Sequence, residues 1–496
     1  MTTLYSRVKK LTDMDNDLPM PISEKHPHGG RMFPFRWLTR RTIRAIVFCC
    51  TFLAILACLR IFVTLSGPET REEDVKPDPQ FPPLYSKQHQ DELAYPQHNL
   101  DLPFPEGRDG KYIWMANHVH GSGWGNAMQE LVLNSYLAYK SGRSFVFDNY
   151  TWNRDGSDYT DYDGKLIPSR IPLAALMTGP TAGGPFPDGD PAPRSVTKEY
   201  WDIVCPNPRV IDSYEVTDHL NQEASALELL EAWVQKLDEV GDRCVEISRE
   251  SLQLFGIWVF GSERVLDIFP GLAKSPIIKN FGWSPLVHAA FDVNRHLFSP
   301  TPKLETYLPS LFGSSDPYSA LPGLLVLHIR RGDFGNHCHH LAKWASRWNG
   351  FNTFPELPDK FEPHPGGGGG EASEEAVQYT LEHCFPTVTQ IVEKVHKVRN
   401  STAGKGLKNV YIMTNAPKSW ILQLKYGLNK IADWDHIASS RDLKLTWDQK
   451  YIAQSVDMMI GQRAQVLIGN GFSSLTSNIV MLRMAKGLPP DSNRFW

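Results

Sequence analysis

Leu324 to Asp333 reads LLVLHIRRGD, an apolar run of the kind that forms a buried strand, followed at once by two adjacent arginines. Guanidinium groups at the carboxyl end of a core strand carry a large desolvation cost unless an anion meets them there. They suit phosphate oxygens, which they can hold in bidentate fashion. Ligands of open α/β sheets also bind just outside the carboxyl ends of the strands. The stretch therefore predicts a phosphate-binding strand end or, alternatively, an internal ion pair with a carboxylate such as Asp333.

Two further apolar runs in the same half of the chain end in polar loops. Val410–Thr414 leads into Asn415, and Val466–Ile468 leads into GNGFSSLT from Gly469 to Thr476. Alternating strand and helix patterns occur in both halves, and they predict an α/β fold of two domains with parallel sheets and a ligand cleft between them. We expect these domains at residues 106–320 and 321–496.

The loop GNGFSSLT offers a second set of groups that could bind the anion. Its glycines allow a ligand to approach the backbone closely, and Ser473 or Ser474 could cap the helix that continues to Met484. A helix start with free amides and hydroxyls is a good cradle for a diphosphate. The serines could instead serve only as a helix cap. Because the loop is paired with arginines on another strand end, we expect a diphosphate ligand.

A glycine-rich loop from His118 to Gly125, HVHGSGWG, occupies the matching position in the first half. It lies between a strand predicted at Tyr112–Met115 and a helix predicted from Asn126 to Lys140, which suits a phosphate or sugar site. Its G-x-G-x-G spacing differs from the dinucleotide fingerprint. Asp148, at the end of the next predicted strand, could contact a ribose. An NAD-dependent enzyme is therefore an alternative, but it leaves the arginines unexplained.

The segment from Ala45 to Leu65 is long and apolar enough to span a bilayer and is interrupted only by Arg60. Arginines precede it and acidic residues follow it, so the positive-inside rule leaves residues 1–44 in the cytoplasm. We expect a single-pass type II membrane protein with a flexible, proline-rich stem at 66–105. Five glycines at 366–370 predict a mobile surface loop. The formal net charge of −4 gives no reason to propose nucleic acid as a partner.

Four cysteines beyond the membrane segment suit disulfides in an oxidising lumen. Three pairings are possible, of which Cys205–Cys244 with Cys338–Cys384 keeps each bridge within one half. Two metal sites are alternatives: a divalent cation at Asp161-Tyr162-Asp163, or zinc held by the second cysteine pair and its neighbouring histidines. A solvated loop and a disulfide are the simpler accounts of these residues, so we expect no metal.

Three motifs in the second half together resemble a known family. HIRRGD at His328–Asp333 closely resembles the H-x-R-R-x-D motif of the α1,2- and α1,6-fucosyltransferases, which is related to the shorter H-x-R of protein O-fucosyltransferases. Val410–Asn415 resembles their second motif, and Asp457–Ser477 resembles their third. Gly121–Asn126, ending GWGN, is similar to a glycine-rich loop near the start of their catalytic domains. The resembling regions are about 111–135 and 321–486.

The resemblance implies two Rossmann-like domains facing a cleft (a GT-B-like fold). Together with the predicted type II membrane anchor, it leads us to expect a location in the Golgi or endoplasmic reticulum membrane, with the catalytic region lumenal. It also implies GDP-fucose as donor, inversion at the anomeric carbon, no cofactor or required metal, and a glycan or glycoprotein acceptor. Arg330 would hold the β-phosphate and stabilise the leaving GDP, while Arg331 and Asp333 orient the site. His328 would contact the nucleotide or its loop. Further donor contacts would come from Gly123, Gly125, Asn126, Asp457, Ser473, Ser474 and Thr476.

The general base that takes the acceptor proton is left open. Asp333 and Glu130, one helical turn after Asn126, are candidates, and Glu130 could instead be a solvated helix residue. Two other functions remain as alternatives. A transferase using another nucleotide sugar would share these features, because arginines and capped helices recognise diphosphate rather than sugar. A non-catalytic lumenal glycan-binding protein would keep the same fold.

Overall fold

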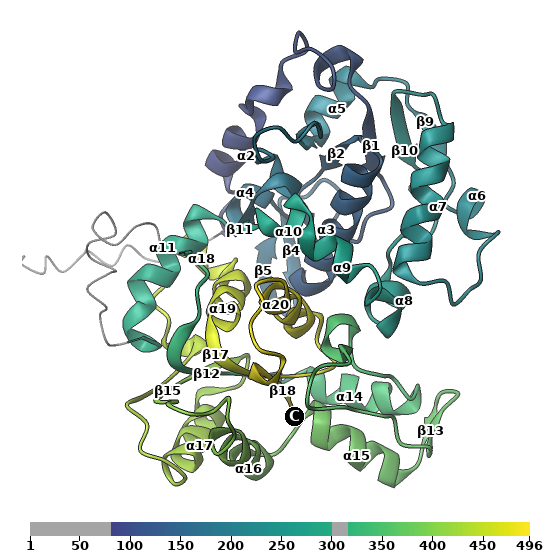
Figure 1. Cartoon of the computed structure of the whole chain (residues 1–496). Helices are drawn as coiled ribbons and strands as arrows, with labels where there is room; N and C mark the ends of the chain where they lie inside the picture. The colour runs from purple at the N-terminus through teal and green to yellow at the C-terminus, as the bar shows by residue number, and fades with distance from the viewer. Residues whose placement is uncertain (1–80, 300–315) are drawn as a thin grey trace, which may run out of the picture. The chain divides into compact units, whose positions relative to one another are not determined.

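Two five-stranded parallel sheets form the framework of the residues that this computed structural model describes, 81–299 and 316–496 (Figure 1). The predicted cytoplasmic tail, the predicted membrane helix and residues 66–80 of the predicted stem lie outside these ranges. None of the helices in the described part combines the length and apolarity needed to cross a bilayer. The sheets confirm the prediction of an α/β fold with parallel strands.

The first sheet has the strand order β8-β2-β1-β10-β9. Its centre follows the predicted strand–helix–strand order, with β1 (Tyr112–Met115), α3 (Trp124–Lys140) and β2 (Ser144–Phe147). The outer elements are β8 (Val196–Thr197), α5 (Lys198–Val204), β9 (Arg209–Ile211), α7 (Ala226–Glu239) and β10 (Cys244–Ile247). α3 is buried along most of its length, because other elements cover it on several sides.

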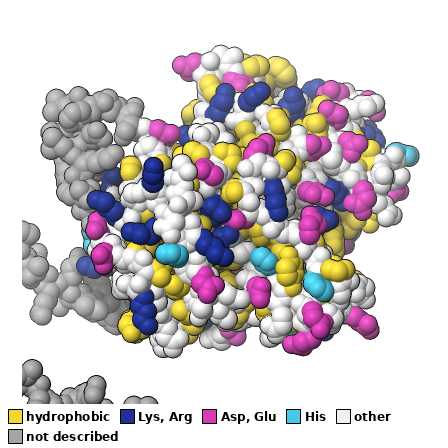
Figure 2. All heavy atoms as spheres, turned by 60° about the horizontal axis from the view of Figure 1, so that its bottom comes forward, with side chains coloured by type: hydrophobic (Ala, Val, Ile, Leu, Met, Phe, Trp, Pro, Cys, Tyr) yellow, Lys and Arg dark blue, Asp and Glu magenta, His cyan; other side chains and the backbone are white. Residues whose placement is uncertain are grey.

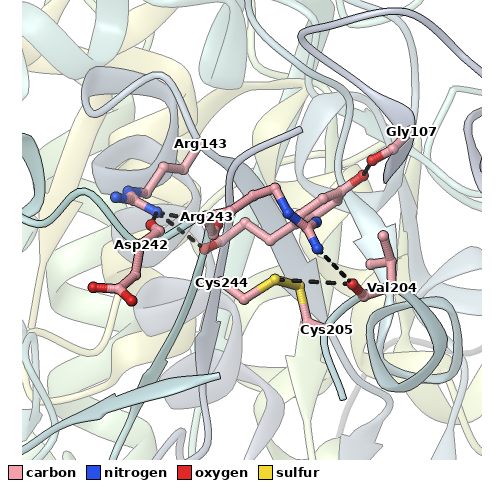
Figure 3. Close-up of a disulfide and its surroundings, with 8 residues drawn as sticks. Gly107, Arg143, Val204, Cys205, Asp242, Arg243 and Cys244 are labelled. Carbon is pink, nitrogen blue, oxygen red and sulfur yellow. Dashed lines mark hydrogen bonds between the residues drawn. A yellow bond between two sulfur atoms is a disulfide. The ribbon is translucent and has the colours of Figure 1, made fainter. Parts of the chain in front are cut away.

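The disulfide Cys205–Cys244 joins the end of α5 to the start of β10 (Figure 3). Beside it, the buried side chain of Arg143 donates hydrogen bonds to backbone carbonyls at the end of α7 and in the turn before β10. A second disulfide, Cys338–Cys384, joins α14 (Phe334–Lys343) to α15 (Glu374–Cys384). Of the three pairings that the sequence left open, the structure has the one that keeps each bridge within one half.

The second sheet has the order β16-β15-β12-β17-β18. Its strands are β12 (Leu321–Ile329), β15 (Asn409–Thr414), β16 (His436–Ser439), β17 (Ala464–Gly469) and β18 (Asn493–Phe495). Both faces are buried: Leu324 and Val326 of β12 belong to the main core, and Leu325 and Leu327 to a second core. In Figure 1, α16 (Val388–Arg399) and α17 (Lys418–Asn429) lie below this sheet, and α19 (Ala453–Gln462) and α20 (Ser474–Ala485) lie above it.

α20 of the second half packs directly against α3 of the first half. The side-chain amide of Gln129 donates to the Ser477 hydroxyl at 3.1 Å, and both side chains are fully buried. The side-chain amide of Asn478 donates to the carbonyl of Gly125 at 2.7 Å. The main core runs through this contact without a break. The two helix starts are therefore held together by apolar packing and by buried hydrogen bonds.

Short elements lie between the strands of the first sheet in the sequence and between the first sheet and the second. Three two-stranded antiparallel sheets pair β3 (Tyr150–Thr151) with β6 (Arg170–Ile171), β4 (Tyr159–Tyr162) with β5 (Lys165–Pro168), and β7 (Met177–Thr178) with β11 (Gly282–Trp283). The helices here are α4 (Leu173–Leu176), α6 (Tyr214–Thr217), α8 (Ile257–Phe260), α9 (Phe269–Lys274), α10 (Pro276–Lys279) and α11 (Pro285–Asn294).

Two sequence-based expectations about loops are wrong. Residues 81–105 of the predicted flexible stem belong to the fold, because α2 (Ser86–Leu93) packs against α4 and Tyr85 is buried with its hydroxyl 2.6 Å from the Asp448 carbonyl. The five glycines at 366–370 form a short hairpin of β13 (Gly367–Gly368) and β14 (Glu371–Ala372). Positive φ angles at three of these glycines make its tight turn.

Candidate functional site

A cleft of about 710 Å³ opens at the carboxyl ends of β12 and β15. Side chains after both strands line it, together with residues of α19 and the first turn of α20. The turn between β4 and β5 reaches it from the first half of the chain. The lining residues are Tyr162, Asp163, His328, Arg330, Asp333, Met413, Thr414, Asn415, Gln454, Asp457 and Leu475. Four residues of the predicted donor site are therefore brought together here: His328, Arg330, Asp333 and Asp457.

Arg330 directs a guanidinium group with little internal pairing into this cleft. Its side chain is 33% exposed, and its closest carboxylate is that of Asp333 at 3.7 Å, which is itself 63% exposed. The guanidinium lies 4.7 Å from the ring centre of Phe334. Its Nε atom is buried and has no hydrogen-bond partner among the described residues. The ion pair with Asp333, which was the alternative to a phosphate site, is thus present, but it is long and leaves donors of the guanidinium available for an anion.

Arg331 occupies a different environment from that of its neighbour. It is buried, and its guanidinium lies 4.2 Å from the ring centres of both Phe385 and Trp420 and donates to the Pro386 carbonyl. Burial lowers the pKa of Arg331 to about 10. Successive residues of an extended chain point to opposite sides, so only one of the two arginines can face the cleft. Arg331 anchors the strand end and does not line the cleft.

Asn415, whose side chain was not assigned a role from the sequence, holds the ends of β12 and β15 together. Its side-chain oxygen accepts from the Arg331 backbone amide at 2.7 Å, and its side-chain nitrogen donates to the Arg331 carbonyl at 2.9 Å. This pair of hydrogen bonds fixes the backbone beside Arg330. The signal was present in the sequence, because asparagine directly follows the second apolar run.

His328 is held as a neutral side chain at the base of the cleft. Its Nδ1 atom lies 2.7 Å from the Thr476 hydroxyl, and the Trp496 indole donates to its backbone carbonyl at 3.0 Å. Burial, together with the charge of Arg330, lowers the pKa of His328 to about 3. Thr476, predicted to bind diphosphate, is fully buried, and its hydroxyl is hydrogen-bonded to His328. It therefore positions the histidine.

Asp457 of α19 presents a partly shielded carboxylate to the cleft. It accepts hydrogen bonds from the Tyr411 hydroxyl at 2.7 Å and from the Ser440 hydroxyl at 2.8 Å. Burial raises the pKa of Asp457 to about 6, although both hydroxyls oppose that shift. Tyr411 and Ser440 come from β15 and from the turn after β16, so their roles could not be found without the sheet order. The carboxylate is fixed in direction and can accept from a ligand.

The start of α20 contacts the glycine-rich loop. Ser473 is the N-cap residue, but neither its side chain nor that of Ser474 makes the predicted capping hydrogen bond. The first backbone amides of a helix lack intrahelical acceptors, and Leu475 in the first turn of α20 contributes to the lining of the cleft. Asn126 donates from its side chain to the Ser122 hydroxyl at 2.9 Å, which orders the glycine-rich loop.

Gly125 is expected to tolerate no side chain, because a Cβ atom there would lie 2.6 Å from the Leu475 backbone nitrogen and 2.7 Å from the Ser474 hydroxyl oxygen. Gly125→Ala should therefore lower the free energy of unfolding by about 1–3 kcal/mol, the usual range for overpacking. Gly123→Ala is the matched control, because a Cβ atom at Gly123 would meet nothing within 4 Å. Urea unfolding of both variants measures the difference, and equal stabilities would contradict the proposed contact.

Glu130, a predicted general base, does not line the cleft. It is 2% exposed, and its carboxylate accepts from the Val119 backbone amide at 2.7 Å. Burial raises the pKa of Glu130 to about 8, against a smaller opposing effect of this hydrogen bond. With His118 and Asp148 it borders a cavity of about 20 Å³ under the glycine-rich loop. The alternative interpretation, a solvated helix residue, is wrong because neighbouring elements cover α3.

The residues of the two alternative metal sites also have other roles in the structure. In the described ranges, no group of three or more His, Cys, Asp or Glu side chains is arranged to hold a metal ion. Cys338 and Cys384 are joined in a disulfide, which leaves no thiolate for the zinc alternative. Asp161 accepts from the Gly164 amide at 3.0 Å in the β4–β5 turn. This turn was predicted to be solvated, yet Tyr162 and Asp163 line the cleft.

Acidic and basic side chains are interspersed over the face shown in Figure 2. Proteins that follow a nucleic-acid backbone concentrate Lys and Arg in a continuous patch or stripe. The described residues on this face do not show such a stripe, and the formal net charge of the chain is −4.

No family model and no curated protein matches the chain. Among solved structures, it is similar to POFUT1 in complex with GDP-fucose, with 13% identity over 78% of this chain and 98% of that chain and a TM-score of 0.45. It is similar to the NodZ alpha-1,6-fucosyltransferase soaked with GDP-fucose, with 12% identity over 75% and 92% of the two chains and a TM-score of 0.32. It is also similar to a mutant of Arabidopsis thaliana FUT1 in complex with GDP, with 9% identity over 82% and 79% and a TM-score of 0.32.

Proposed function

We propose that the chain is a glycosyltransferase that moves fucose from GDP-fucose to a hydroxyl of a glycan or glycoprotein. The observation that carries the proposal is the guanidinium of Arg330, which faces a cleft of about 710 Å³ with a buried, unpartnered Nε atom. A diphosphate would supply the missing acceptor oxygens, and guanidinium–phosphate pairs are strong because they are charge-assisted and bidentate. The resemblance of the three surrounding motifs to fucosyltransferase motifs supports GDP-fucose as the donor.

The residues of the cleft suggest how the reaction would proceed. Arg330 would stabilise the negative charge that develops on the leaving diphosphate, while the amides at the start of α20 would bind the same group. Asp457 would accept hydrogen bonds from the nucleotide. The acceptor oxygen would attack the anomeric carbon from the face opposite the diphosphate and thereby invert its configuration. Asp333, exposed at the mouth of the cleft, is the candidate base that could reach the acceptor.

The proposed setting is the lumen of the Golgi or endoplasmic reticulum, with Ala45–Leu65 as the membrane anchor and no cofactor or metal required. The two disulfides support an oxidising compartment, because such bridges persist there and are rare in the cytosol. Protection of the C-terminal region from added protease in sealed microsomes is the check on this orientation. Digestion without detergent would contradict it.

A donor screen tests the proposed function directly. We expect GDP and GDP-fucose to raise the melting temperature of the detergent-solubilised full-length chain, because a ligand at 100 times its Kd stabilises a protein by about 2.7 kcal/mol. UDP and UDP-sugars at the same concentrations should give little change. EDTA should not abolish the GDP response. Release of free fucose, or its transfer to a mixture of glycoprotein acceptors, measures turnover.

Each other outcome points to a different function. An equal response to UDP would favour a transferase that uses another nucleotide sugar. A GDP response without turnover on any acceptor would favour a non-catalytic glycan-binding protein. If no nucleotide changes the melting temperature, the assignment of a nucleotide-sugar cleft is wrong.

A further inference from the structure

A second pocket lies in the first half of the chain and shares no lining residue with the donor cleft. Its volume is about 170 Å³, smaller than the roughly 300–1,000 Å³ of pockets that enclose a whole small molecule. Residues that follow three neighbouring strands of the first sheet contribute to it: Ala116 after β1, Asp148 after β2 and Arg249 after β10. In α/β sheets, this edge is where ligands bind.

Three arginines and one carboxylate line this pocket: Arg154, Arg170, Arg249 and Asp148. The carboxylate already has partners, because Asp148 accepts from the Asn149 amide at 2.7 Å and lies 3.8 Å from the His118 ring. Although burial opposes ionisation, hydrogen bonding by His118 and Asn149 lowers the pKa of Asp148. The pocket therefore carries an excess of positive charge that its own carboxylate does not neutralise.

Arg154 and Arg249 line the same pocket, in which Asp148 is the one acidic side chain among the lining residues. Burial and the charge of Arg249 lower the pKa of Arg154. Arg154 donates to the His118 carbonyl at 2.8 Å, so its position is fixed by the backbone. Among the described residues Arg249 makes no hydrogen bond or ion pair, whereas Arg170 donates to the Gly156 carbonyl at 3.3 Å and lies 3.5 Å from the Asp158 carboxylate. Two repelling guanidiniums in one pocket are stabilised when an anion binds to both.

One segment of the chain connects this pocket to the donor cleft. Thr151 of β3 and Arg170 of β6 line the arginine pocket, whereas Tyr162 and Asp163, at the tip of the β4–β5 hairpin, line the donor cleft. From Arg170 to Asp163 the chain can span at most about 23 Å, at 3.3 Å per residue. An extended molecule lying along this hairpin could therefore reach both sites. The indole of Trp114 adds an aromatic surface in the pocket.

We propose that the arginine pocket binds an anionic group, either a carboxylate or a sulfate ester, of an acidic saccharide acceptor whose reacting hydroxyl lies in the donor cleft. The acceptor role rests on the proposed function, whereas the anion site rests on the three arginines alone. The acidic unit would lie several sugar units from the reacting hydroxyl. Arg249 would contact the anion directly, because its guanidinium is exposed and makes no hydrogen bond or ion pair with the described residues.

Calorimetric titration of the full-length chain in detergent tests the pocket with four probes. These are a heparin tetrasaccharide, tetragalacturonate, neutral cellotetraose and sodium sulfate. We expect at least one of the two acidic tetrasaccharides to bind, and the probe that binds distinguishes sulfate from carboxylate. Its affinity should fall as salt rises from 50 to 200 mM, a range over which the Debye length shortens to below about 10 Å. Tight binding of cellotetraose, or sodium sulfate binding as tightly as the tetrasaccharides, would overturn the proposal.

Arg249→Gln is the decisive variant because this exposed side chain makes no hydrogen bond or ion pair with the described residues that the substitution would break. We expect it to weaken binding of the acidic tetrasaccharide by about 10-fold or more, the usual effect of losing a charge-assisted hydrogen bond. Arg249→Lys should restore part of the affinity. Lys279→Gln, which removes one positive charge from the exposed end of α10, is the matched control and should bind normally. Equal affinities in Arg249→Gln and Lys279→Gln would overturn the site.

The GDP response separates this proposal from the proposed function. Both variants should keep the GDP-dependent rise in melting temperature of the unaltered chain, because neither residue lines the donor cleft. If GDP stabilises the chain but acidic tetrasaccharides do not bind, the arginine pocket fails and the donor site stands. If acidic tetrasaccharides bind through Arg249 but GDP has no effect, the anion site stands and its role in holding an acceptor is overturned.

Discussion

Replacing Arg330 with alanine is expected to lower kcat for fucosyl transfer by about 100-fold or more, the usual effect of removing one preorganised charge contact from a reacting centre. The same change should abolish the GDP-dependent rise in melting temperature. The physical reason is the weak internal pairing of this guanidinium, whose nearest carboxylate is 3.7 Å away and exposed. Steady-state assays with GDP-fucose and melting curves with GDP measure the two effects.

Arg330→Lys and Arg347→Ala serve as controls for this result. Lysine keeps the charge but cannot hold two phosphate oxygens at once, so we expect Arg330→Lys to retain only a small part of the activity. Arg347 pairs with Glu362 at 2.9 Å on the surface with half of its side chain exposed, so Arg347→Ala should leave kcat unchanged. If Arg330→Ala keeps both its GDP response and its kcat, Arg330 does not contact the diphosphate.

Much of the framework could be predicted because the strands of the second sheet are buried on both faces. Continuous apolar runs such as Leu324–Ile329 and Val410–Thr414 are typical of parallel strands covered by helices. Their carboxyl ends meet at one edge of the sheet, and this is the edge at which the sequence predicted a ligand beside Arg330. The sequence pattern therefore contained the location of the site and part of its lining.

The different roles of Arg330 and Arg331 required the structure. Both are arginines at a strand end, and the resemblance placed both at the donor. Because side chains alternate along a strand, the two arginines must point to opposite sides. Which of them is buried depends on the rings of Phe385 and Trp420, which come from a loop and from α17 and pack against Arg331. Contacts between residues so distant in the sequence are set by tertiary packing, which no local pattern specifies.

For a related reason, the sequence did not predict that the hairpin carrying Tyr162 and Asp163 lines the cleft. Its sequence is polar and lacks an apolar alternation, so it predicts a solvated loop. In the structure its strands are largely exposed, and its position depends on the β3–β6 pairing at its base. Its contribution to the cleft arises from this anchoring of both ends and not from any periodic signal.

Replacing Glu130 with glutamine is expected to remove a pH dependence of stability while leaving kcat close to that of the unaltered chain. The pKa of Glu130 is about 8 in the fold, compared with 4.5 for an exposed glutamate. The fold therefore favours the neutral carboxyl group, and ionising it inside the protein is unfavourable. Its stabilising contribution is complete below pH 4.5 and is lost as the pH rises to about 8.

The effect of the Glu130 pKa shift on the free energy of unfolding is large enough to measure. Between pH 4.5 and 8, a group that is protonated in the folded state and ionised in the unfolded state lowers the free energy of unfolding by up to about 1.4 kcal/mol per pH unit. Glutamine has nearly the same shape, cannot ionise, and can still accept from the Val119 amide. Urea unfolding of the two proteins at several pH values should give a shallower decline for Glu130→Gln. The difference in stability should be greatest near pH 8.

Glu92 provides the matched control, because it is also buried, accepts from the Ala174 amide at 2.7 Å, and has a pKa raised by burial to about 8. Glu92→Gln should flatten the stability profile in the same way, and the two effects should add because the residues share no partner. Neither substitution should change kcat if both carboxyls are structural. A loss of about 100-fold in kcat in Glu130→Gln alone, with Glu92→Gln fully active, would instead identify Glu130 as the proton acceptor. That outcome would require the glycine-rich loop above it to open, since in the structure Val119 and the packing around α3 separate this carboxyl group from the donor cleft.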